Sequence, residues 1–137
     1  MRIYIKFWTF CSAEIKGKRI FTFGGAKSSD IEYRKEHISW WKEEMPSQEE
    51  YDEGIKNLEK YNWEVDYVIT HTCSSNTLLL MNTILDRNKE IGEINEYFSS
   101  IERKLIYKHW FFGHFHKDYI VLPNQTVIFD DILKVDQ

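Results

Sequence analysis

The order of apolar and polar positions predicts strands at both ends of the chain and helices between them. Residues 3–10 and 19–23 are rich in Ile, Tyr, Phe and Thr and alternate in polarity, which is typical of half-buried strands. The segment EIKGKR, residues 14–19, contains Gly17 and predicts a hairpin turn.

Helices are predicted in the middle of the chain from apolar residues that recur every three or four positions. The first begins after Pro46, where Ser47 and Glu50 have the spacing of a capping box. Its apolar face is formed by Tyr51, Ile55 and Leu58. Residues 77–85 predict a second helix, and a third is indicated by the stripe Ile94, Tyr97, Phe98, Ile101 and Leu105.

The remaining strands are predicted at residues 66–70 (DYVIT), 107–112, 119–122 and 126–129. Strands at both ends with helices inserted between them favour an α/β or α+β domain, with a mixed sheet and flanking helices. A chain of 137 residues can bury one hydrophobic core, and no repeat or Pro- or Gly-rich linker divides it. We therefore expect residues 1–137 to form a single domain.

Composition and charge exclude several classes of function. The formal net charge of −4 argues against direct binding to nucleic acid phosphates. No apolar run approaches the roughly 20 residues that a membrane span needs. Cys11 and Cys73 form no C-x-x-C pair, which suits a reducing compartment. We therefore expect a cytoplasmic protein that makes no contact with membranes or nucleic acid.

Three histidines follow predicted strands and are candidate metal ligands. His71 follows the strand at residues 66–70, and His114 and His116 follow the strand at residues 107–112. Polar side chains from separate strand ends converge in open sheets, and neutral imidazole binds zinc, manganese and iron. In an extended chain the rings of His114 and His116 would share one face. The alternative is a set of strand-end histidines that only form hydrogen bonds with their neighbours.

Other acids and histidines near these positions are weaker candidates. Asp118, Asp30 and Asp131 could supply a fourth ligand or orient one, although acids near turns are commonly just solvated. We interpret His109 and His37 as non-ligands, because one precedes the buried part of its strand and the other lies in a charged helix.

Two segments resemble the last metal-ligand blocks of the calcineurin-like metallophosphoesterases. These are DYVITHT (residues 66–72) and WFFGHFHKD (residues 110–118), and the G-H-x-H block is the most specific part. The segments FGGAKSSDIEYR, WWKEEMPSQEEY and FDDI also resemble parts of a bacterial and phage branch of that family. The resemblance implies that His71 and His114 bind one metal ion and that His116 binds a second.

The chain resembles only the C-terminal half of that family's β-sandwich fold. The D-x-H, G-D-x-x-D and G-N-H-D/E blocks, which supply the bridging aspartate and the other ligands in the family, are absent. Two metal ions about 3.5–4 Å apart repel each other strongly without a bridging carboxylate. We therefore expect one divalent transition metal per chain, zinc in preference to manganese, and no catalytic residue.

This reasoning favours a protein that acts by contact. Residues 43–53 contain six acids and no Lys or Arg, which is typical of a helix start but would also suit a basic protein partner. A small acidic protein of this kind could inhibit a host nucleic-acid-targeting system, as anti-CRISPR proteins from phages and mobile elements do. The alternative is a metal-dependent phosphoesterase with residual single-metal activity, or one completed by a second chain. The open sheet edge would also allow a homodimer.

Overall fold

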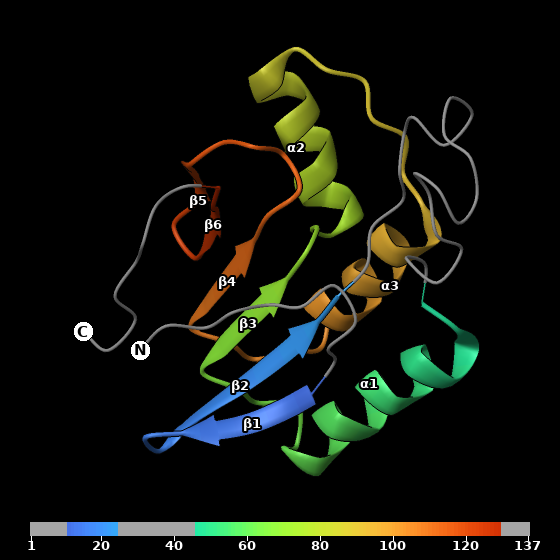
Figure 1. Cartoon of the computed structure of the whole chain (residues 1–137), viewed down its shortest axis with the longest axis vertical. Coiled ribbons are helices and arrows are strands. Elements are labelled where there is room, and N and C mark those ends of the chain that lie inside the picture. Colours follow the sequence, from blue (N-terminus) through green and yellow to red (C-terminus); the bar gives the residue numbers. More distant parts are fainter. Residues whose placement is uncertain (1–10, 25–45, 130–137) are drawn as a thin grey trace, which may run out of the picture.

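The computed structural model describes residues 11–24 and 46–129, which form a mixed sheet with flanking helices (Figure 1). The strands are β1 (Cys11–Ile15), β2 (Lys18–Phe23), β3 (Tyr67–Thr70), β4 (His109–Phe112), β5 (Tyr119–Leu122) and β6 (Gln125–Val127). The helices are α1 (Gln48–Lys60), α2 (Ser75–Leu85) and α3 (Glu93–Glu102). The predicted α/β class is therefore confirmed for this part of the chain.

The described strands form one sheet in the order β1-β2-β3-β4-β6-β5. Neighbours among β2, β3, β4 and β6 run parallel, whereas β1 and β5 pair antiparallel at the two edges. Thr70 of β3 lies opposite Phe112 of β4, so these two strands end level with each other. The amide of Gly113 then donates to the carbonyl oxygen of His71 at 3.1 Å. This pairing brings the two histidine-bearing loops to the same edge of the sheet.

The helices pack on one face of the sheet, where the main core lies. Every second strand residue points to this face, including Phe23, Val68 and Trp110. The helices contribute buried residues from their apolar stripes: Tyr51 and Leu58 of α1, Leu78 and Met81 of α2, and Ile94, Phe98 and Ile101 of α3. All three helices therefore share one continuous core with β3 and β4, the strands that His71 and His114 follow.

A second, smaller apolar cluster lies on the opposite face of the sheet. It consists of Ile20, Tyr67, Ile69 and Phe111, with Ile128 packed against them. Each of these four strand residues is less than 10% exposed. Both faces of the central strands are thus apolar, which is typical of parallel strands.

Local signals predicted the first helix correctly. The Ser47 hydroxyl accepts from the Glu50 amide at 3.2 Å, and the Glu50 carboxylate accepts from the Ser47 amide at 3.3 Å. Both halves of the predicted capping box are therefore present. Tyr51 and Leu58 are buried and Ile55 is half-buried, as the predicted apolar face requires.

Several predicted boundaries differ from the structure. The turn at Gly17 is present, but residues 11–15 form β1 because they pair with β2 up to the turn. The strand predicted at residues 3–10 lies outside the described residues. The third helix ends at Glu102, and Leu105 instead reaches the core from the following turn. The last strand is Gln125–Val127 rather than residues 126–129.

Candidate functional site: a histidine pair at the ends of parallel strands

The two neighbouring strand ends bring His71 and His114 into direct contact. His114 Nδ1 lies 3.2 Å from His71 Nε2, and the two rings meet nearly edge to face, with centroids 5.1 Å apart. Both side chains are half-buried. The residues immediately around them are held firmly, because the Trp110 indole donates to the Thr70 hydroxyl at 2.8 Å just before His71.

The separation of these two nitrogens fits a shared metal ion. Zinc binds histidine nitrogen at about 2.0–2.1 Å in tetrahedral geometry, which places two ligand nitrogens about 3.3 Å apart. The observed 3.2 Å agrees with that value. It also agrees with a hydrogen bond between two neutral rings, in which one nitrogen donates and the other accepts.

The H-x-H pattern predicted an extended chain from His114 to His116, but the structure shows that this segment is not extended. His114 and His116 both have left-handed backbone conformations, with φ of 77° and 53°. The chain therefore curls after β4, so the His114 ring meets His71 while the exposed His116 ring stacks on Phe129 at 4.9 Å. Non-glycine residues in this conformation cost about 1–3 kcal/mol each and cluster at functional sites.

Within residues 11–24 and 46–129 there is no group of three or more His, Cys, Asp or Glu side chains that could hold a metal ion. The structure thus brings together His71 and His114, while the role of His116 as a third ligand stays a prediction. The pKa values of both other histidines are lowered chiefly by burial, with a smaller electrostatic contribution from His116.

Burial keeps both rings of the pair in the neutral form that binds metals. Desolvation, followed by the charge of His116, lowers the pKa of His71 to about 4. Desolvation also lowers the pKa of His114 to about 3, with further contributions from Lys89, His71, His116 and Arg87. Protonation therefore does not compete with a metal for these nitrogens at neutral pH.

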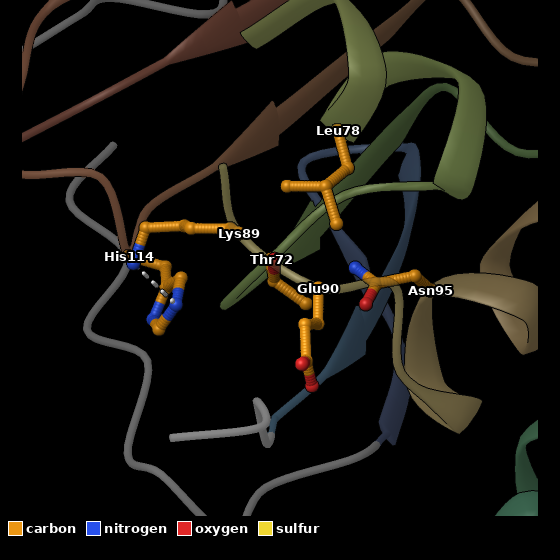
Figure 2. Close-up of a pocket in the computed structure, with 6 residues that line it drawn as sticks. All are labelled: Thr72, Leu78, Lys89, Glu90, Asn95 and His114. Atoms are coloured by element: carbon orange, nitrogen blue, oxygen red, sulfur yellow. Dashed lines mark hydrogen bonds between the residues drawn. The ribbon is translucent and has the colours of Figure 1, made fainter. Parts of the chain in front are cut away.

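Lys89 is a part of the site that sequence reasoning missed. Its ammonium lies 3.5 Å from His114 Nε2, and the dashed line in Figure 2 marks this interaction. A small cavity of about 20 Å³ is lined by Lys89, His114, Thr72, Leu78, Glu90 and Asn95. Residues 86–92 join α2 to α3 with no apolar periodicity, so no local signal indicated that they return to the histidines.

Asn95 fixes this loop and was also missed as a site residue. Its side chain donates to the Cys73 carbonyl at 2.8 Å and accepts from the Gly92 amide at 2.9 Å. It is 4% exposed, so both contacts are buried. The Gly92–Asn95 spacing is that of a helix cap, which was the only signal available in the sequence.

Two of the other residues that were weighed as metal ligands lie in the described part of the chain, and each has a different contact. The Asp118 carboxylate accepts from the Phe129 amide at 2.7 Å, and His109 Nε2 lies 2.7 Å from the Thr126 hydroxyl at the opposite end of β4. Asp30, Asp131 and His37 lie outside the described residues. Cys73 is buried in the core, and burial raises the pKa of its thiol to about 12.

No family model matches this chain, and no curated protein or solved structure matches it. The resemblance to metallophosphoesterases therefore stays a hypothesis, which rests on the residues quoted above. Among the helices of residues 46–129, none is long and apolar enough to cross a membrane.

We expect the metal-free protein to lose stability as the pH falls from about 6.5 to about 4. The folded-state pKa values of His71 and His114 lie near 4 and 3, below the unfolded value of about 6.5. The unfolded chain then binds more protons in this range, so each histidine costs at most about 1.4 kcal/mol of stability per pH unit. The full contribution is present above the unfolded pKa.

Urea unfolding in the presence of chelator, at several pH values, measures this loss. The double variant H71Q/H114Q provides the comparison, because it keeps the carboxylates that titrate near pH 4. A shallower slope in the variant is expected. An identical slope would show that the two histidines are not buried in the neutral form.

Proposed function

We propose that this protein binds one divalent transition metal ion, zinc in preference to manganese, through His71 and His114. The observation that carries the proposal is the 3.2 Å separation of their facing nitrogens at the ends of adjacent parallel strands. Both rings are kept neutral by burial. His116 is proposed as a third ligand, because it lies two residues beyond His114 and its side chain is exposed.

We further propose that the domain is the C-terminal half of a metallophosphoesterase-type sandwich. Its support is the position of the two quoted blocks, which end neighbouring parallel strands and place their histidines together. A sheet with helices on one face and an apolar second face, formed by Ile20, Tyr67, Ile69 and Phe111, suits one half of a layered fold. The ion would be structural, tying the β3 and β4 loops together.

Titration of the chelator-stripped protein with zinc tests the metal proposal. We expect close to one zinc per chain by calorimetry and by elemental analysis after desalting. Manganese should bind more weakly, because imidazole ligands follow the general order in which zinc exceeds manganese. Less than a tenth of an equivalent of zinc after reconstitution would contradict the proposal.

Lys89 opposes metal binding in the observed arrangement, and its replacement should therefore tighten it. Its ammonium favours a lone pair on His114 Nε2, which leaves the proton on Nδ1, the nitrogen that faces His71. A metal needs the opposite tautomer. In K89Q the glutamine oxygen can accept from Nε2–H, so zinc affinity should rise about tenfold, the lower end of outer-shell effects on metal affinity.

The control for K89Q is K117Q, which removes the same charge from the exposed residue next to His116. Equal changes in zinc affinity in both variants would show that the loss of one positive charge alone explains the effect. A weaker affinity in K89Q would show that Lys89 supports the site rather than opposing it.

We propose that the protein works by contact with a basic protein partner and does not hydrolyse phosphoesters. The supporting features are the site of His71 and His114, with no third ligand beside it in the described part of the chain, and the acidic start of α1, where Glu49, Asp52 and Glu53 are exposed. Glu50 is only half-exposed, because it is used by the capping box. Inhibition of a nucleic-acid-targeting system in the cytoplasm, in the manner of an anti-CRISPR protein, is the role that we propose for such contact.

Hydrolysis assays decide between contact and catalysis. With zinc or manganese present, hydrolysis of p-nitrophenyl phosphate and of bis-p-nitrophenyl phosphate should stay at background, because no carboxylate bridges a second ion at the described site. Activity that copurifies with the protein and disappears in H71A would instead establish the phosphoesterase alternative.

A further inference from the structure

A cleft of about 420 Å³ lies between α1 and α3, and neither His71 nor His114 is among its lining residues. The two helices are neighbours in Figure 1, and the Tyr97 hydroxyl of α3 donates to the Tyr51 carbonyl of α1 at 2.9 Å. The cleft is lined by Tyr51, Asp52 and Ile55 of α1 and by Glu93, Glu96 and Tyr97 of α3. Its size is within the range of small-ligand sites.

The inner wall of the cleft is aromatic. The rings of Tyr51 and Tyr97 lie 4.5 Å apart, and Tyr51 stacks on Phe23 at the end of β2, with centroids 5.8 Å apart. Such rings attract cations through their electron-rich faces. Gly54 permits this packing, because a Cβ at that position would clash with the Tyr97 hydroxyl.

Tyr51 carries a buried hydroxyl that has no hydrogen-bond partner in the described part of the chain. The residue is only 6% exposed, and leaving a buried polar group unsatisfied is costly and rare. Burial, Glu93 and Glu50 raise the pKa of the phenol to about 12, so the hydroxyl stays protonated and keeps a lone pair for a donor. Tyr51 lines the cleft, so a donor group that reached this hydroxyl from the cleft would satisfy it.

The rim of the cleft is acidic. Asp52, Glu93 and Glu96 line it and are exposed, and none of the described lining residues is a lysine or arginine. Glu96 accepts from the Ser75 hydroxyl at 2.8 Å, which holds its side chain in place on α3. Three carboxylates around an aromatic wall favour a cationic ligand with several N–H donors.

We propose that this cleft binds an arginine side chain presented by a protein partner. The inference rests on the contact part of the proposed function and gives the partner a specific chemical feature. A guanidinium group has five N–H donors in a plane, so it can lie over the Tyr97 ring while it donates to carboxylates of both helices and to the Tyr51 hydroxyl. A lysine ammonium, a compact and strongly hydrated charge, matches this arrangement less well.

Binding of a fluorescein-labelled nine-residue peptide with three arginines tests the proposal. Matched peptides carry lysine or the neutral analogue citrulline in place of arginine, and spermidine serves as a free polyamine competitor. We expect the arginine peptide to bind more tightly than the lysine peptide, the citrulline peptide not to bind, and spermidine to compete only weakly.

Two variants examine the cleft itself. Y51F removes only the unsatisfied hydroxyl, so the melting temperature should stay the same or rise while peptide affinity falls about tenfold. E93Q/E96Q removes two rim charges and should weaken binding at least as much. Its control, E59Q/E64Q, removes two exposed charges at and just beyond the C-terminal end of α1, outside the cleft lining, and should change affinity less than threefold by our estimate.

The proposal is overturned if the arginine peptide does not bind, if Y51F binds it as the wild type does, or if both double variants lose affinity equally. Spermidine binding as tight as that of the arginine peptide would assign the cleft to a free polyamine instead. The zinc content of every variant is measured in parallel, and H114A should bind the peptide normally. A failure of the metal site is therefore distinguishable from a failure of the cleft.

Discussion

H71A and H114A should each reduce zinc affinity at least 100-fold. No other single substitution is expected to weaken zinc binding as much. Each variant removes one of two neutral imidazoles that face each other at 3.2 Å. One remaining imidazole of the pair, even with His116 as the proposed further ligand, is a much weaker site than the full set. Calorimetric titration of the chelator-stripped proteins measures the change.

The same variants should lose the stabilisation that zinc gives the wild type. At a zinc concentration 100 times the dissociation constant, the wild type gains about 2.7 kcal/mol, whereas neither variant should gain a measurable amount. H109A is the matched control, because His109 lies in β4, the strand that precedes His114, but contacts Thr126 instead. Loss of zinc binding in H109A as well would point to general unfolding rather than to removal of a ligand.

W110A should destabilise the fold by about 3–5 kcal/mol, the range for truncation of a large buried aromatic residue. Trp110 is 1% exposed, packs edge-on against Phe98 and Tyr107, and donates to the Thr70 hydroxyl. Since domains are stable by only about 5–15 kcal/mol, the variant should unfold at much lower urea concentration and hold the β3 and β4 loops less firmly.

W110F separates the hydrogen bond from the packing. Phenylalanine keeps most of the volume and loses only the donor to Thr70, so it should cost about 1–2 kcal/mol. Urea unfolding followed by circular dichroism measures both variants. A cost below about 1.5 kcal/mol for W110A would be inconsistent with a fully packed core at this position.

Features that depend on a few adjacent residues could be predicted from the sequence. The capping box of Ser47 and Glu50 and the turn at Gly17 are present because neighbouring residues alone determine them. The contact between His71 and His114 was predicted from a more general rule, that polar side chains meet at the ends of neighbouring strands. The register of β3 and β4 bears this out.

Features that depend on how distant segments pack could not be predicted. The left-handed turns at His114 and His116 separate two rings that an extended chain would have kept together. Lys89 approaches His114 from a loop without periodicity, and the unsatisfied hydroxyl of Tyr51 results from the packing of α1 against α3. In each case the sequence shows the side chain, and only tertiary structure shows what it faces.

X-ray absorption at the zinc K-edge of the zinc-loaded protein tests the central claim most directly. We predict a first shell that contains at least two imidazole nitrogens at about 2.0–2.1 Å, with the outer-ring scattering typical of histidine. This signature should be absent from H71A/H114A incubated with zinc under the same conditions. A shell of oxygen ligands alone in the wild type, or an unchanged spectrum in the double variant, would contradict a metal site built on His71 and His114.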